Sequence, residues 1–423
     1  MSLFSPIHHT FAPLADARQV LLALSLLLLP WKHRAGRSAA HLARSIEHTF
    51  GGRAFLFASG RESLLGFFQA MRLSPGEEII VQALTCVVVP NAIHAAGGRP
   101  VYADIDSETL NLTAQSVRAV LSSRTRAIIC QHTFGIPGPV DALRALCDEY
   151  NILLIEDSAH ILPDAAGPAA VGSKGDAMML SFGRDKAISG VSGGAILVRA
   201  PDIANRLGDI ERRSHLLPRI TIVRLLCYPI FYALAKPFYG LGLGKVFLAL
   251  LGRARLLVPI VTKAEKNGGM SPVLHRLPNA LATLALDQWK RRKALNDRRR
   301  ENVAALWEAL AAKGWLHAAG SPLRVPSAIV PHLPLQKFPV FVRNAESIRM
   351  QLKKKNIHLH DGWTGCVICP ESVDATSADY RAGSDPKAES CSQSLLCLPT
   401  HPTMTPRKVK RLVQALERIL SAS

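Results

Sequence analysis

Aromatic and acidic residues are both scarce in this chain of 423 residues. Phe, Trp and Tyr make up 6% of it, which argues against an RNA-binding surface built from rings that stack on bases. Asp and Glu number 32 against 51 Lys and Arg, so the formal net charge is +19, which favours anionic partners. Because no helix-turn-helix, zinc-finger or RNA-binding motif is recognisable, we expect no nucleic-acid partner.

No segment has the order of a secretory signal peptide. The apolar run 20–31 (VLLALSLLLLPW) is too short to span a bilayer, which requires about 20 residues. Its positive charges, at Lys32, Arg34 and Arg37, follow the run, whereas a signal peptide has them in front. We therefore expect the eight cysteines to be reduced thiols and the protein to be cytoplasmic.

The cysteines do not form a regular metal-binding pattern. Four of them have the spacing C-x2-C-x21-C-x5-C, which is irregular at the second pair: Cys366, Cys369, Cys391 and Cys397. Cysteine is also commonly buried as a small hydrophobic residue. We therefore expect no metal site.

Short apolar runs alternate with helix-like stretches from about residue 50 to residue 200. Strands separated by helices indicate a mostly parallel sheet covered by helices on both faces. The sequence therefore predicts an α/β fold with a large domain and a mostly parallel seven-stranded sheet. The candidate strands are Ala54–Ala58, Ile79–Gln82, Pro100–Ala103, Ala127–Gln131, Ile152–Ile155, Ala177–Ser181 and Gly194–Val198.

A smaller C-terminal α/β domain is predicted after a long helix over 278–313. Pro278 at its start and Gly314 past its end fit the usual distribution of these residues at helix ends. A strand is predicted over 338–342 and a final helix from about Thr405. We divide the chain into an apolar and basic N-terminal arm, a large domain with an insert at 220–261, and a small domain, with the bounds 1–45, 46–270 and 271–423.

The insert 220–261 mixes apolar residues with five basic ones. We expect Pro229, Pro237 and the glycines of YGLGLG to break any long helix. Two interpretations stay open. The insert is either a buried helical connection or dimer surface, or a structure in the membrane interface, where apolar and basic residues act together.

Three motifs point to a cofactor site. In NILLIEDSAH (151–160), Asp157 follows an apolar strand, at the end of a sheet where ligands bind, although such an Asp is also a common helix cap. In SFGRDKAISGVSGG (181–194), Lys186 on a glycine-rich loop can form a Schiff base with a carbonyl cofactor, or be a surface charge. In FASGRESLLGFF (57–68), a helix begins after Ser59-Gly60 and offers N–H groups to an anion. Together these motifs fit pyridoxal 5'-phosphate, which needs an anchored phosphate, a carboxylate and a lysine.

The sequence resembles the sugar aminotransferases of the DegT/StrS type, which are fold-type I pyridoxal-phosphate enzymes. The similarity runs from about residue 50 to 200 and resumes at 278–315 and 388–420. The matching passages are SGRESL, PVYADIDSETLNL, QHTFGIPGPVDAL, IEDSAH, GDAMMLSFGRDKAISGVSGG and LCLPTHPTMT.

This resemblance implies a role for each matching residue. Lys186 binds the cofactor covalently and transfers the proton, Asp157 pairs with the ring nitrogen, and His160 lies near the phenolic oxygen. Three residues hold the phosphate, the last two through their backbone: Ser181, Gly60 and Arg61. The family usually has Thr in place of Arg61, so we expect the guanidinium to assist the phosphate. It usually stacks an aromatic ring on the cofactor where this chain has Cys86.

The resemblance also implies the reaction. We expect an aminotransferase of polysaccharide biosynthesis, a homodimer that transfers an amino group from an amino acid, glutamate, to a keto-sugar linked to a nucleotide. The insert 220–261 replaces the region that usually reaches the partner subunit's active site. Two alternatives stay open: the same chemistry on a lipid-linked substrate at the membrane, and a non-catalytic regulator that binds pyridoxal phosphate.

Overall fold

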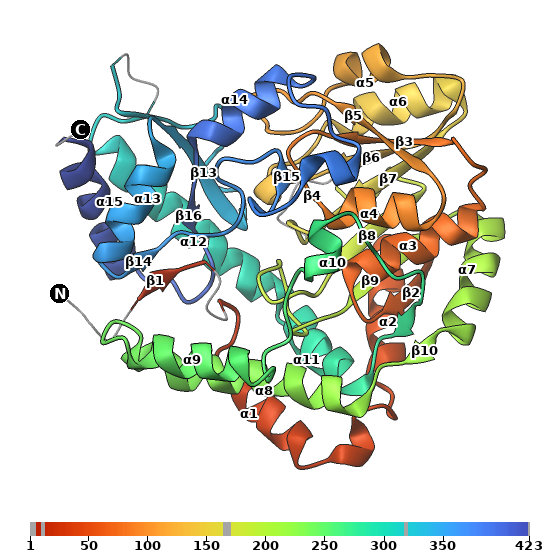
Figure 1. The fold of residues 1–423 in the computed structure, drawn as a ribbon, viewed down its shortest axis with the longest axis horizontal. Helices are drawn as coiled ribbons and strands as arrows, with labels where there is room; N and C mark the ends of the chain where they lie inside the picture. The colour runs from red at the N-terminus through yellow and green to blue at the C-terminus, as the bar shows by residue number, and fades with distance from the viewer. Residues whose placement is uncertain (1–5, 10–12, 164–170, 317–319, 422–423) are drawn as a thin grey trace.

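The structure is a computed structural model that describes residues 6–9, 13–163, 171–316 and 320–421 (Figure 1). A central sheet organises the larger part of the molecule. Its strands are β2 (Arg53–Phe57), β3 (Glu78–Gln82), β5 (Arg99–Ala103), β6 (Thr125–Gln131), β7 (Leu153–Asp157), β8 (Ala177–Ser181), β9 (Gly194–Val198), β10 (His215–Leu216) and β11 (His275–Arg276). Their order across the sheet is β10-β11-β2-β9-β8-β7-β6-β3-β5.

The predicted α/β fold with a mostly parallel sheet is confirmed. Strands β5, β3, β6, β7 and β8 are parallel neighbours, and β9 runs antiparallel to both of its neighbours, β8 and β2. All seven predicted strands are present, and the two-residue strands β10 and β11 extend one edge. Strand β7 continues two residues beyond its predicted end, because Asp157 stays in register with Gln131 of β6.

Side chains alternate between the two faces of the sheet, so each face has its own core. Ile79 and Ile155 belong to the core beneath three helices: α3 (Gly60–Met71), α4 (Val88–Ala95) and α7 (Pro201–Arg213). Leu154 and Met178 point to the opposite face, which packs against five helices: α2 (Ser38–Phe50), α5 (Ala114–Val120), α6 (Val140–Tyr150), α8 (Arg219–Ala235) and α11 (Asn279–Lys290).

The C-terminal part builds a second core around a small antiparallel sheet. Its strands, in spatial order, are β12 (Leu323–Arg324), β13 (Lys337–Val342) and β16 (Leu395–Pro399). Four helices lie in this part: α12 (Arg292–Ala311), α13 (Ala345–Lys354), α14 (Pro386–Ser394) and α15 (Pro406–Leu420). The predicted strand at 338–342 is confirmed as β13, and the predicted final helix as α15, whose N-cap is Thr405.

The prediction of one helix over 278–313 was wrong. The segment forms α11 and α12, separated at Arg291, which pairs with Asp16 and Asp287. The chain changes direction here because α11 packs into the large-domain core, whereas α12 contributes to the C-terminal core. The division of the chain at residue 270 stays a prediction.

The insert is helical on both sides of a break. Helix α8 continues through Pro229, contrary to the prediction. The proline removes one backbone hydrogen bond, and burial of Ile222, Leu225 and Leu226 in the core offsets this loss. The break comes later, at Pro237 and the following glycines, before α9 (Leu243–Arg253). By length and composition alone, one helix among the described residues, 219–238, is long and apolar enough to cross a membrane.

Candidate active site

Strand ends and one helix start meet at a cavity of about 420 Å³. Asp157 and Ser181 end β7 and β8, and α3 begins shortly after β2. In a parallel sheet these carboxyl ends lie at one edge, where ligands bind. The cavity brings together all the site residues predicted from the sequence: Lys186, Asp157, His160, Ser181, Gly60, Arg61 and Cys86.

The start of α3 forms an anion site beside β8. Ser59 caps the helix by accepting from the Glu62 N–H at 3.2 Å, and the N–H groups of Gly60 and Arg61 belong to the first turn, which has no intrahelical partners for them. A Cβ on Gly60 would lie 3.0 Å from the Ser181 hydroxyl, and one on Gly194 would lie 2.5 Å from the Gly60 Cα. Glycine at both positions therefore permits the close approach of helix and strand that offers N–H groups and a hydroxyl to a phosphate.

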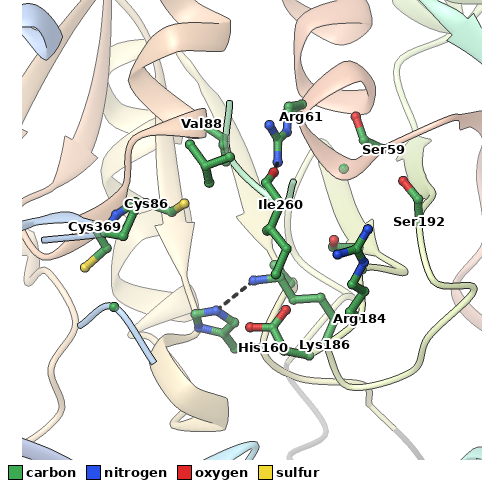
Figure 2. Close-up of a pocket in the computed structure, with 18 of the residues that line it drawn as sticks. Ser59, Arg61, Cys86, Val88, His160, Arg184, Lys186, Ser192, Ile260 and Cys369 are labelled. Carbon is green, nitrogen blue, oxygen red and sulfur yellow. Dashed lines mark hydrogen bonds between the residues drawn. The ribbon is translucent and has the colours of Figure 1, made fainter. Parts of the chain in front are cut away.

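Lys186 lies against His160 (Figure 2). The lysine Nζ is 3.2 Å from His160 Nε2, while His160 Nδ1 accepts from the Phe134 backbone N–H at 3.3 Å. Burial and the nearby Lys186 lower the pKa of His160, so the ring is neutral. Because Nδ1 is an acceptor, we assign the ring proton to Nε2, the nitrogen that faces the Lys186 amine.

The neighbouring carboxylates Glu156 and Asp157 face opposite sides of the sheet. Glu156 is held by His132 and by the backbone N–H groups of Gly172 and Gly175, so its role is structural. Asp157 lines the cavity and accepts from the Ala159 N–H at 3.0 Å. Burial raises the pKa of Asp157, against the opposing effects of the Ala159 N–H and Lys186. A cation placed in the cavity would therefore stabilise its charged form.

Cys86 belongs to the wall opposite Ser192 and Arg184 (Figure 2). Its strand β4 (Thr85–Cys86) pairs with β15 (Ile368–Cys369), and Val88 lies beside it. Burial raises the pKa of the Cys86 thiol, so the group is a neutral, apolar surface. The wall therefore presents sulfur and aliphatic atoms at the position where the resemblance led us to compare Cys86 with an aromatic ring.

Two arginines bind the segment 258–261, which forms one side of the cavity. Arg61 pairs with Glu265 and donates to the carbonyl of Ile260, and Arg184 donates to the carbonyl of Val258 at 2.6 Å. The guanidinium of Arg61, which we expected at the phosphate, is thus engaged with this segment. Only its backbone N–H belongs to the anion site.

Sequence reasoning missed several residues of the cavity. Arg184 and Ser192 lie in the stretch 181–194 that contains Lys186, so that motif could have identified them. Trp363, which packs edge-on against His160 at 5.3 Å, and the segment 258–261 are brought in by tertiary packing and have no local signal. Among the described residues, no group of three His, Cys, Asp or Glu side chains could hold a metal ion.

Three observations show that the residues of the cavity fit pyridoxal phosphate. Glycines keep the anion site accessible, the buried Asp157 has a raised pKa that a ring N–H⁺ would offset, and the Lys186 amine is in the same cavity. Lys186 would bind the aldehyde, Asp157 the ring nitrogen, and Ser181 with the start of α3 the phosphate.

Comparison with known proteins identifies the family. The DegT/DnrJ/EryC1/StrS aminotransferase family matches residues 30–215 and 262–417. The fold is similar to that of Helicobacter pylori PseC, an aminotransferase of pseudoaminic acid biosynthesis, with a TM-score of 0.72, 15% identity and 99% of each chain covered. It is also similar to DesI, solved with its TDP-sugar product, with a TM-score of 0.68 and 21% identity over 100% of this chain and 93% of DesI.

A third similar structure contains a cofactor. NtdA from Bacillus subtilis, solved with bound PMP, has a TM-score of 0.69 and 18% identity over 96% of this chain and 82% of NtdA. The family match covers most of the chain and includes the regions of Lys186 and Asp157. This chain therefore belongs to the DegT/DnrJ/EryC1/StrS aminotransferase family and is a pyridoxal-phosphate-dependent aminotransferase.

Proposed function

We propose that this enzyme transfers an amino group from glutamate to a keto-sugar linked to a nucleotide. The main observation is the placement of Lys186, His160 and Asp157 beside the anion site at the start of α3. DesI, with its TDP-sugar product, and PseC have the same fold and support a sugar acceptor. We assign the reaction to polysaccharide biosynthesis in the cytoplasm, which agrees with cysteines that are all free thiols.

The chain's own residues perform the binding and proton transfer. Pyridoxal phosphate, when bound, supplies a carbonyl group and an electron-withdrawing ring. Asp157 holds a proton at the ring nitrogen. The Lys186 amine removes the proton from the α-carbon of the donor and delivers one to the carbon of the acceptor, as a general base and acid within reach of both. His160, whose Nε2 lies 3.2 Å from Nζ, orients this amine.

The cavity also contains basic groups for an anionic acceptor. Lys266 and His360 line it, together with the two arginines that hold the segment 258–261. A nucleotide-linked sugar has a diphosphate that the ammonium group of Lys266 and the two guanidinium groups attract, and the overall charge of +19 assists its approach. We further propose a homodimer with the cavities near the interface, as the family resemblance implies.

Spectroscopy can test both half-reactions. Single amino acids are added to the holoenzyme, and loss of the visible absorbance of the bound cofactor is followed. Glutamate should give the fastest loss and yield 2-oxoglutarate, and a TDP- or UDP-linked keto-sugar should restore the band. Restoration only by keto-acids without a nucleotide would contradict the acceptor class, and a faster response to another amino acid would contradict the donor.

A keto-sugar linked to a membrane lipid is a second candidate acceptor. The specific observation is that the segment 258–261 and Leu225 give the cavity an apolar wall, and both lie at 216–261, the stretch that the family match leaves out. The two acceptors are distinguished by comparing kcat/KM for nucleotide-linked and polyprenyl-phosphate-linked keto-sugars in the same detergent. A higher value for the lipid-linked compound would assign the lipid class.

A further inference from the structure

Two of the stretches that the family match leaves out, 1–29 and 216–261, contain helices that lie together in space. Helix α1 (Ala17–Leu27) comes from residues 1–29 and α8 and α9 from residues 216–261. Helix α1 packs against α8, which packs against α9, and the three form the lower edge of the molecule in Figure 1. We call the segments 17–37 and 219–261, which contain these helices, the turn Pro30–Lys32 and the short helix Lys236–Phe238, the helical layer.

The helical layer exposes an unusual number of large apolar side chains. Leu28 is 78% exposed, and Leu21, Trp31 and Leu243 are each more than 60% exposed. Others are Leu24, Ile220, Leu234, Phe238, Leu241, Val246 and Leu250. Exposed apolar side chains gathered on neighbouring helices are typical of an interaction site in a protein.

The charge of the helical layer has one sign. The segments 17–37 and 219–261 contain ten Lys and Arg residues and no Asp or Glu. Seven of them are exposed: Arg18, which pairs with Asp287, and Lys32, Arg37, Arg219, Lys245, Arg253 and Arg255. A partner for this surface must therefore accept apolar side chains and bring negative charge.

Helix α8 lies along the large domain and does not project from it. Ile222, Leu225 and Leu226 are buried in the large-domain core, and the guanidinium of Arg184 lies 4.3 Å from the ring centre of Tyr228. To cross a membrane, this helix would have to leave that core and remove Leu225 from the cavity wall. Helix α8 therefore stays packed along the large domain, and any contact with a membrane would be made by its exposed side.

We propose that the helical layer docks on an anionic lipid bilayer and lies in the headgroup region, with its apolar side chains inserted and its basic side chains at the phosphates. A second copy of the chain fits less well. A symmetric dimer would place the same patch of each subunit face to face, so exposed basic residues would oppose basic residues with no acidic partner in either segment. An anionic bilayer supplies both the apolar medium and the missing charge.

Flotation with liposomes tests the proposal independently of catalysis. The holoenzyme should float with vesicles of phosphatidylcholine and phosphatidylglycerol, remain in the soluble fraction with phosphatidylcholine alone, and dissociate as salt is raised. Reversal of two charges, Arg253→Glu with Arg255→Glu, should weaken binding at least about 30-fold. The matched control is Arg381→Glu with Lys387→Glu, two exposed basic residues near α14, which should bind within about 3-fold of the wild type.

A second variant tests the apolar part. Leu28, Leu243 and Leu250 are changed together to Ser, with Met350→Ser on α13 as the exposed control. Only the triple variant should lose flotation, and sedimentation should show an unchanged oligomeric state. If the wild type does not float with acidic vesicles at low salt, the proposal is wrong. If the triple variant dissociates a dimer, the helical layer is an interface between copies, which also overturns it.

Discussion

Asp157→Asn separates the chemical role of this carboxylate from its effect on stability. In the wild type, Asp157 accepts from the Ala159 N–H at 3.0 Å. Asparagine has the same shape and keeps an oxygen that can accept this hydrogen bond, so the substitution removes the charge alone. Asp157 is 4% exposed, so water cannot replace that charge. Loss of one positioned electrostatic partner costs about 100- to 1,000-fold in kcat, or about 2.7–4 kcal/mol. We therefore expect kcat to fall at least about 100-fold.

The same substitution should not destabilise the cofactor-free protein. Burial raises the folded-state pKa of Asp157, so the folded protein binds its proton more readily than the unfolded chain does. The carboxylate therefore lowers stability as pH rises from its unfolded pKa through its folded one, and Asn removes that penalty. At neutral pH the melting temperature of the apoprotein should be equal or higher.

Glu156→Gln is the matched control. Burial alone would raise the pKa of Glu156, but His132 and backbone N–H groups lower it overall, so its charge contributes stability above its unfolded pKa. This variant should lose about 1–3 kcal/mol of stability and keep its turnover once folded. Single-turnover kinetics and thermal unfolding are measured for both variants. Near-normal turnover in Asp157→Asn, or equal turnover losses in both, would refute the assignment of the ring-nitrogen partner.

Three other results are expected. Borohydride treatment of the holoenzyme should attach the cofactor to the peptide containing Lys186, and Lys186→Ala should abolish the label; a label on another lysine would be incompatible with the assignment. Gly194→Ala should weaken cofactor binding at least about 10-fold, because its Cβ would lie 2.5 Å from the Gly60 Cα, whereas Gly252→Ala, with no atom within 4 Å of the added Cβ, should bind normally. Arg61→Ala should leave cofactor affinity within about 10-fold but increase proteolysis of the segment 258–261, because its guanidinium holds that segment.

The sequence predicted what depends on local pattern. The strands are apolar runs between turns, and Asp157, Ser181 and Lys186 are identified because they lie at strand ends or in the loops that follow. Parallel strands align their carboxyl ends, so the residues converge without further information. Errors arose where tertiary burial outweighs a local signal: α8 passes through Pro229 because its apolar face is packed into the large-domain core.

The sequence alone could not predict which group Arg61 contacts or that the insert reaches the cavity. Arg61 has two options, the phosphate and a partner elsewhere, and only the fold brings Glu265 and the Ile260 carbonyl to it. The chain from α9 reaches the cavity within a few residues, since α9 ends at Arg253 and the wall includes Val258. A short segment after α9 therefore joins the helical layer to the cavity wall, and Arg61 and Arg184 hold this segment in place. This connection depends on tertiary contacts, so the catalytic motifs alone do not identify it.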